Sequence, residues 1–369
     1  QQVRWPNNTS VASAAIAASE DIAVEAENHN QGADVATNYT GISYPPHGDN
    51  PGWGQAATTL YEPTIKRDFF NATSDLHIMN VGSGATNVTI AYYNDSGTFQ
   101  GSLACNLAPQ AKCVKVANSA WGTLLNARIT ANQPLAVVNV ERDAAGSPTR
   151  VATNHASANP TTFLYAPIYK KNWYSQNTSL HIRNTSSSQA SVTVTYYDQD
   201  SSASYSDGPY LIPPNGVLRR WAPSVTALPV SFAGSAVIDS DKPIVARLYE
   251  QGEVRKMSNG TFVQGSQASY VPVACNTCGG WRSYIRVQNV GSAAAEVQVR
   301  YYDSGGNAVG NPETLSNLGV YRARNAASLP GGLDGSAVLT ADQPIIVRVY
   351  LVYPDTSQDL SMTYDAPNR

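Results

Sequence analysis

The chain repeats itself with a period of 104–105 residues, which is the length of a whole domain. LHIMNVGSGATNVTIAYYNDSG (76–97) returns as LHIRNTSSSQASVTVTYYDQDS (180–201) and as IRVQNVGSAAAEVQVRYYDSGG (285–306). In each copy an asparagine lies 12 residues before a Tyr-Tyr pair and 17 residues after a proline; the asparagines are Asn80, Asn184 and Asn289. Such a long period predicts tandem domains, since the units of solenoid proteins are only ~20–45 residues long.

Within each copy, apolar and polar residues alternate. The apolar positions of segment 88–93 are Val88, Ile90 and Tyr92, and segments 192–197 and 297–302 follow the same pattern. This alternation is typical of half-buried antiparallel strands. Gly/Ser-rich turns separate about seven short strands per copy, which predicts Ig-like antiparallel β-sandwich domains of about 100 residues. The prolines that we expect at the turn of the last hairpin are Pro134, Pro243 and Pro344.

The two ends of the sequence resemble fragments of the same repeat. VRWP (3–6) aligns with LRRWAP (218–223), and 10–28 aligns with the last hairpin of a repeat. MTYDAPNR (362–369) resembles the first strand of a repeat. The expected domains are an incomplete sandwich with a linker loop (1–57), three complete repeats (58–160, 161–266 and 267–353) and a C-terminal tail that is a candidate donor strand (354–369).

An incomplete domain has exposed strand edges, which are templates for pairing with another chain. A strand from a second copy is one way to complete the domain, as in donor-strand complementation. The alternatives are that the sequence is a segment of a longer repeat protein, or that the half-repeat packs on its neighbour in the same chain. The residues predicted for a polymer interface are Val3, Trp5, Ile16, Ile22, Val24, Met362, Tyr364 and Pro367.

Composition indicates an extracellular protein. Only 14% of residues are charged and the net charge is −3, whereas ~25% is usual for soluble domains. This excludes the basic surface of a nucleic-acid-binding protein, and no apolar run approaches the ~20 residues of a membrane span. The four cysteines form two close pairs, Cys105 with Cys113 and Cys275 with Cys278, which predicts two local disulfides in an oxidising compartment. A single CxxC lacks the second pair of ligands that a zinc site needs.

Candidate sites are few, and we expect no catalytic residue, metal site or cofactor. His77 and His181 are equivalent in the repeats, but Arg286 occupies this position in the third copy, which favours a solvated sheet face. NDSG (94–97) and DQDS (198–201) are predicted as hairpin turns rather than calcium sites. Segment 41–55 is a Pro/Gly-rich loop that either binds a sugar or a neighbour, or packs on the sandwich; its candidate residues are Tyr44, His47 and Trp53. The candidate glycosylation sites are Asn7, Asn8, Asn38, Asn71, Asn87, Asn94, Asn177, Asn184 and Asn259.

The tandem-sandwich pattern resembles bacterial cell-surface and extracellular filament proteins built from Ig-like repeats. The resemblance covers the whole chain at the level of pattern, and it implies secretion and a structural or adhesive role. We therefore expect a secreted subunit of an extracellular filament or surface layer, whose partners are other copies of the same chain. The alternative is an adhesin or carbohydrate-binding module that binds glycans through the 41–55 loop or through Tyr93, Tyr197 and Tyr302.

Overall fold

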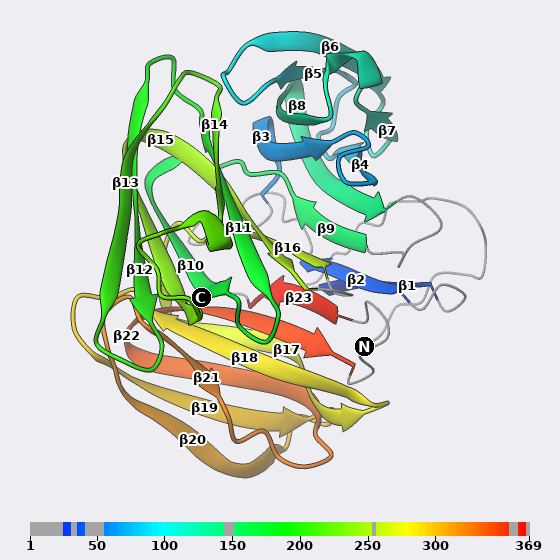
Figure 1. Ribbon diagram of the computed structural model, residues 1–369. Coiled ribbons are helices and arrows are strands. Elements are labelled where there is room, and N and C mark those ends of the chain that lie inside the picture. Colours follow the sequence, from blue (N-terminus) through cyan, green and yellow to red (C-terminus); the bar gives the residue numbers. More distant parts are fainter. Residues whose placement is uncertain are drawn as a thin grey trace.

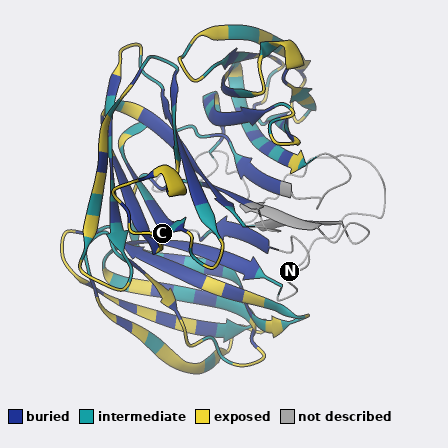
Figure 2. Cartoon of the chain, in the orientation of Figure 1, coloured by how far each residue is buried: buried dark blue, intermediate teal, exposed yellow. Residues whose placement is uncertain are grey.

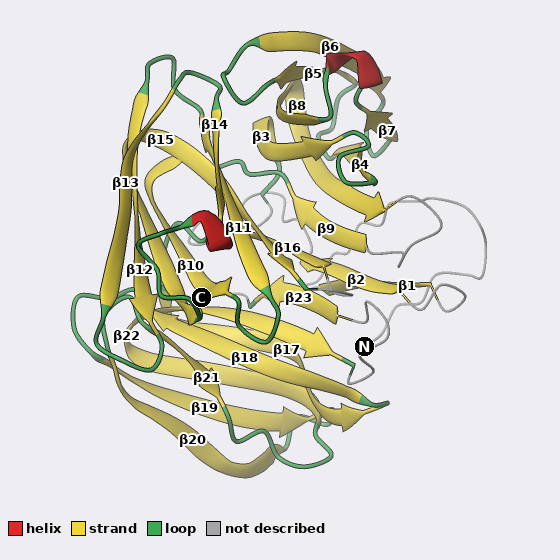
Figure 3. Ribbon diagram, viewed as in Figure 1, coloured by secondary structure: helices red, strands yellow, loops and turns green. Residues whose placement is uncertain are grey.

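A computed structural model describes residues 25–30, 35–40, 55–143, 151–252, 256–353 and 361–366. These residues form an all-β protein with three repeated antiparallel units and one two-stranded hairpin (Figure 1), which confirms the predicted tandem repeat. The helical segments in this part of the chain are two 3-10 turns, Ser119–Trp121 and Ala222–Ser224 (Figure 3). None of the described helices is long and apolar enough to cross a membrane.

Each unit contains seven strands in the same order. The N-terminal hairpin is β1 (Glu25–Asn30) and β2 (Val35–Thr40). Unit 1 contains β3 (Ala57–Lys66), β4 (Ala72–Asn80), β5 (Thr86–Tyr93), β6 (Phe99–Leu107), β7 (Lys112–Val116), β8 (Leu124–Asp143) and β9 (Val151–His155). Unit 2 contains β10 (Thr161–Lys171), β11 (Asn177–Asn184), β12 (Ala190–Asp198), β13 (Ser204–Ile212), β14 (Val217–Trp221), β15 (Phe232–Gln251) and β16 (Lys256–Gly260). Unit 3 contains β17 (Ser266–Cys278), β18 (Trp281–Asn289), β19 (Ala295–Asp303), β20 (Ala308–Leu318), β21 (Ala323–Ala326), β22 (Asp334–Val352) and β23 (Ser361–Asp365).

One long strand organises each unit. β8, β15 and β22 are 20, 20 and 19 residues long. The first half of β8 pairs with β3 and β5, and its second half pairs with β4 and β9. All seven strands therefore belong to one connected sheet, which curls into a barrel-like unit, in place of the two separate sheets of an Ig-like sandwich.

The predicted last hairpin was wrong, because its proline lies inside the long strand. Pro134, Pro243 and Pro344 are midway along β8, β15 and β22, and the Pro134 carbonyl accepts a hydrogen bond from the Val81 amide at 3.0 Å. Proline removes a ladder donor without reversing the chain, so the strand continues with new partners on either side. The sequence pattern did not distinguish this exchange of partners from a turn.

The alternation seen in the sequence fills the interior of each unit. Val88, Ile90 and Tyr92 are fully buried in unit 1, and the equivalent residues of β12 and β19 are buried in the same way (Figure 2). Each such side chain contributes about 1.5–3 kcal/mol of burial free energy. This confirms the half-buried character predicted for these strands.

The repeated asparagine is a structural residue. Asn80, Asn184 and Asn289 are fully buried at the ends of β4, β11 and β18. In unit 2 the Nδ2 of Asn184 donates to the carbonyls of Ser188 and Ile212, and its Oδ1 accepts from the Ser186 amide. Asparagine recurs here because one side chain satisfies the backbone groups of two turns that the sheet cannot pair.

The C-terminal strand belongs to unit 3. β23 pairs with the second half of β22, just as β9 pairs with β8 and β16 with β15. Residues 362–365 therefore lie in the last strand of a repeat, whereas their sequence resembled the first strand. Met362 and Tyr364 are buried in the core of unit 3.

The last strands of the units gather at the centre of the molecule (Figure 1). β9 lies beside β2 and β16, and β23 also lies beside β2 and β16. These four central strands, β2, β9, β16 and β23, thus form a closed cycle. The N-terminal hairpin contacts units 1 and 3 of its own chain through β2.

Candidate functional site

The polar face of the second strand in units 2 and 3 is an interface with the preceding unit. His181 is buried, and its Nδ1 lies 2.5 Å from Thr64 Oγ1 of unit 1 and 2.8 Å from Arg219 Nη1. Because Arg219 can only donate, Nδ1 accepts, and burial together with Arg219 holds the pKa of His181 well below 6.5. The equivalent Arg286 is also buried and donates to the Pro167 carbonyl of unit 2 at 3.0 Å. The solvated face predicted for this position was wrong in units 2 and 3.

Arg183 crosses from unit 2 into unit 1 and is fully buried. Its Nε donates to Asn126 Oδ1 at 2.6 Å, and its guanidinium lies over the rings of Tyr61 and Tyr93 at 4.9 and 5.6 Å. Burial lowers the pKa of Arg183 to about 10, so the side chain remains charged at neutral pH. Cation–π contacts of this kind contribute about 2 kcal/mol when desolvated. Tyr93, a candidate ligand residue, is partly buried and also contacts this interface.

A buried lysine–glutamate pair recurs beside a tyrosine of the following unit. Lys66 Nζ lies 2.7 Å from Glu141 Oε1 and 4.5 Å from the centre of the Tyr249 ring. Unit 2 repeats the arrangement, with Lys170 Nζ 2.9 Å from Glu250 Oε2 and 5.5 Å from the Tyr350 ring. These contacts tie each unit to the next through groups that are buried, apart from the partly buried Lys170.

Unit 1 adds a second buried ion pair between Glu62 and Arg247 of unit 2. Both side chains are almost completely buried. Burial raises the pKa of Glu62 from 4.5 to about 7, against the opposing effect of Arg247 and the Thr64 amide. Removing either partner would leave a costly buried charge, which makes this contact sensitive to substitution and to pH.

The predicted turns also contact the following unit. The 94–97 turn closes with an Asn94 amide to Thr98 carbonyl bond of 3.0 Å, and Asp95 accepts from Arg219 Nη2 at 2.8 Å. Carbonyls of the 198–203 turn accept from Arg322, including that of Asp198 at 2.7 Å. Among the described residues, no group of three or more His, Cys, Asp or Glu side chains is placed to hold a metal ion.

Charged side chains also meet at the central strands. Equivalent positions of β9, β16 and β23 are occupied by His155, Gly260 and Asp365. Arg348 donates one hydrogen bond to the Gly260 carbonyl and one to Asp365 Oδ1, each 2.6 Å long. Burial lowers the pKa of His155 to about 4, with Asp365 opposing this and Arg247 adding to it. His155 is therefore neutral at physiological pH.

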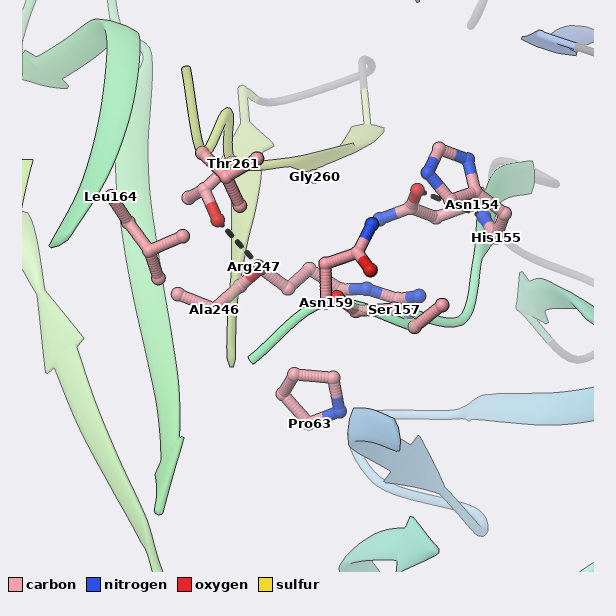
Figure 4. Close-up of a pocket in the computed structure, with 12 residues that line it drawn as sticks. Pro63, Asn154, His155, Ser157, Asn159, Leu164, Ala246, Arg247, Gly260 and Thr261 are labelled. Atoms are coloured by element: carbon pink, nitrogen blue, oxygen red, sulfur yellow. Dashed lines mark hydrogen bonds between the residues drawn. The ribbon is translucent and has the colours of Figure 1, made fainter. Parts of the chain in front are cut away.

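A small cavity lies beside these residues, between units 1 and 2 (Figure 4). Arg247, Asn154 and Asn159 point along it, and its volume is about 20 Å3. This is room for about one water molecule, far below the ~300–1,000 Å3 of typical ligand pockets. The cavity is part of the packing between units 1 and 2.

Exposed aromatic residues occur at the hairpin between the first two strands of units 1 and 2. We call residues 69–72 tip 1, residues 173–176 tip 2 and residues 278–281 tip 3. Phe70 in tip 1 is 83% exposed and Tyr174 in tip 2 is 84% exposed. Their φ angles are +48° and +46°, and the next residues, Asn71 and Ser175, have φ of +62° and +59°. Sequence analysis missed both tips; the signals were the aromatic pairs FF (69–70) and WY (173–174) directly between two strands.

These tips carry backbone strain. Two consecutive residues with positive φ define a type I′ turn, which favours Asn-Gly or Gly-Gly. An aromatic residue in the left-handed region costs about 1–2 kcal/mol. Tip 3 has the same geometry with Gly279 and Gly280, at φ of +56° and +89°. The fold therefore needs only glycine at this position.

The disulfides pair as predicted. Cys105 is joined to Cys113, which links β6 to β7, and Cys275 is joined to Cys278, the first residue of tip 3. No described cysteine is free. Disulfides of this kind are typical of an oxidising compartment.

The structure separates the candidate glycosylation sites by exposure. Asn71 and Asn87 are exposed, and Asn94 and Asn177 are partly buried. Asn184 and Asn259 are buried with their amides donating, the latter to Glu250 Oε1 at 2.9 Å, so the folded chain has no room for a glycan at these two positions. Asn38 lies in β2, and Asn7 and Asn8 lie outside the described residues.

The predicted polymer interface is only partly within the described chain. Met362 and Tyr364 pair with β22 of the same chain, as given above. The other interface candidates lie outside the described residues, namely Val3, Trp5, Ile16, Ile22, Val24 and Pro367. The ligand loop with Tyr44, His47 and Trp53 also lies outside them. Of the other tyrosines, Tyr197 lies against Tyr321 of unit 3, with ring centres 5.4 Å apart, and Tyr302 is partly buried.

Comparisons with known proteins add no family. No family model and no curated protein match the chain. Among solved structures, the chain is similar to "Crystal Structure of Thermotoga maritima 1070", with a TM-score of 0.24 and 10% identity over 28% of this chain and 96% of that chain. A likeness at this level says nothing about function.

Proposed function

We propose that this chain is a secreted structural protein that acts as a rigid multi-unit block of an extracellular assembly or surface layer. The observation that carries the proposal is the way the units are joined. Arg183, Arg247 and Arg286 are buried across the boundaries between units, each with polar partners on the other side. Domains joined by a flexible linker have small, more polar interfaces and move independently, whereas buried charges that depend on the neighbouring unit oppose separation.

Composition and disulfides support the extracellular location. The low fraction of charged residues and the two disulfides both suit an oxidising environment outside the cell. The proposal assigns no reaction to the protein, since the titratable groups described above serve as ion pairs and hydrogen bonds between units. Its partners are other copies of the same chain.

Polymerisation by strand complementation remains one form of this proposal. In the monomer, β23 already pairs with β22, so donation to another copy requires β23 to leave its own unit. Exchange of an identical element between copies is a known route to oligomers. If β23 exchanges, deletion of 354–369 abolishes polymers; if it stays in place, the same deletion destabilises unit 3 of the monomer.

Two measurements test the structural proposal. We expect the native protein in the extracellular or surface fraction with both disulfides intact by non-reducing mass spectrometry. We also expect electron microscopy to show compact particles of constant shape, alone or in ordered assemblies. Recovery only from the cytoplasm with four free thiols, or particles whose units vary in relative position, would contradict the proposal.

A further inference from the structure

The rigid-block role does not require the two exposed aromatic tips. Folding normally removes apolar rings from water, and bulky residues normally avoid positive φ. Phe70 and Tyr174 violate both rules at equivalent positions of two units. Strain of this kind is concentrated at functional sites, where it fixes a side chain in a productive position.

Unit 3 shows that the aromatic ring is not a requirement of the turn. Gly279 occupies the position of Phe70 and Tyr174, with φ of +56°. A Cβ built on Gly279 would meet no heavy atom within 4 Å. A side chain at this position of tip 3 would therefore point into solvent, and Phe70 and Tyr174 are themselves more than four-fifths exposed.

We propose that tips 1 and 2 are binding sites for a neutral polysaccharide. Each tip presents two rings in an edge-to-face pair: Phe69 with Phe70 at 4.7 Å, and Trp173 with Tyr174 at 5.3 Å. Aromatic faces stack on flat apolar surfaces of matching size, and the C–H face of a pyranose ring is such a surface. The exposed polar residues that follow, Asn71 and Ser175, supply hydrogen-bonding groups for sugar hydroxyls.

The chemistry of the tips favours a sugar over a protein or an anionic ligand. A stable protein interface buries about 800 Å2 on each partner, which is much more than a two-residue turn offers. No basic side chain lies within residues 69–72 or 173–176, so nothing in the tips selects an anion. Two equivalent tips in one chain suit a ligand that repeats along its length, because each tip can contact one of its repeating units.

The test compares the chain with a variant that copies unit 3. The Phe70→Gly/Tyr174→Gly double variant and the wild type, both made in a host without N-glycosylation because Asn71 is a candidate site, are applied to an array of neutral polysaccharides that includes cellulose, chitin and xylan. We expect the wild type to bind at least one of them and the double variant to bind about tenfold more weakly or not at all. The thermal midpoint of the double variant should be unchanged or higher, because glycine relieves the strain.

A gain of function completes the test. Gly279→Tyr places an aromatic ring on tip 3 and should strengthen binding to the same polysaccharide at a lower thermal midpoint. The proposal is overturned if the wild type binds none of the polysaccharides, if the double variant binds as well as the wild type, or if binding is seen only to phosphatidylcholine vesicles. A lower thermal midpoint for the double variant would also overturn it, by showing that the rings support the fold. None of these outcomes depends on whether the units form a rigid block.

Discussion

Units 1 and 2 hold a buried lysine–glutamate pair where unit 3 has two apolar side chains. Lys66 and Glu141 correspond to Lys170 and Glu250 in unit 2, and to Cys275 and Leu351 in unit 3. Cys275 and Leu351 are both buried in the core cluster of unit 3. The same curled sheet thus accepts either an ion pair or an apolar pair, but both positions change together. The two positions change together because a buried charge without its partner destabilises the fold much more than the absence of both charges.

The largest expected effect comes from breaking the pair in unit 1. Glu141→Leu removes the carboxylate 2.7 Å from Lys66 Nζ and should lower the free energy of unfolding by about 3–5 kcal/mol. Lys66→Met/Glu141→Leu imitates unit 3 and should recover most of this loss. Urea unfolding followed by tryptophan fluorescence measures both variants. A double variant as unstable as the single one would show that the apolar pair of unit 3 depends on its own surroundings.

The next effect is a pH dependence that comes from Glu62, whose equivalent in unit 2 is Ala166. Burial raises its pKa from 4.5 to about 7. The unfolded chain releases this proton near pH 4.5 while the folded chain holds it, so stability decreases as pH rises from 4.5 to 7, by up to about 3 kcal/mol. Glu62→Gln imitates the protonated form and should remove this decrease. Urea unfolding from pH 4.5 to 8 measures the difference, and parallel curves for the two proteins would contradict the assignment.

A smaller effect is expected at Arg183, whose equivalent in unit 3 is Gln288. Arg183→Gln removes the contacts with the Tyr61 and Tyr93 rings and should cost about 1–3 kcal/mol. Arg324→Gln is the matched control, because Arg324 is exposed and its loss should change stability by less than about 0.5 kcal/mol. Equal effects of the two substitutions would indicate that Arg183 does not hold units 1 and 2 together.

The smallest effect concerns the exposed contact between the same units. Asp95→Asn weakens the ion pair with Arg219, whose N–O distance is 2.8 Å. Asp95 is about half exposed, so the loss should be below about 1 kcal/mol and should shrink as salt is added. Calorimetry at low and high ionic strength measures it. A loss that is large and independent of salt would place this pair among the buried contacts.

Sequence reasoning identified the repeat, the strands and the disulfides because these are local or periodic signals. The alternation of Val88, Ile90 and Tyr92 predicts a half-buried strand whatever the strand packs against. Sequence reasoning misassigned Pro134, because a turn and a change of pairing partners along one strand give the same local sequence pattern. It also placed His181 on a solvated face, because polarity alone does not tell water from a neighbouring unit.

The candidate site was the least predictable part. The aromatic pairs at 69–70 and 173–174 were visible in the sequence, but their meaning depends on positive φ and on exposure, which only the backbone shows. Comparison with Gly279 and Gly280 would have pointed to the same turn in all three units. The alignment of the three repeats at this hairpin carries this signal.

By itself, the sequence determined that this chain is a series of β units of one length, with a fixed pattern of buried residues and two local disulfides. The strands follow from the periodicity of apolar side chains, and the disulfides follow from the short sequence separation within each cysteine pair. The tertiary structure decided how the units join, since contacts such as Glu62 with Arg247 connect residues 185 positions apart. It also decided that β23 completes unit 3 and that the central strands form a closed cycle. The local sequence of a strand does not specify which neighbouring strand it pairs with, because backbone hydrogen bonds are the same for every partner.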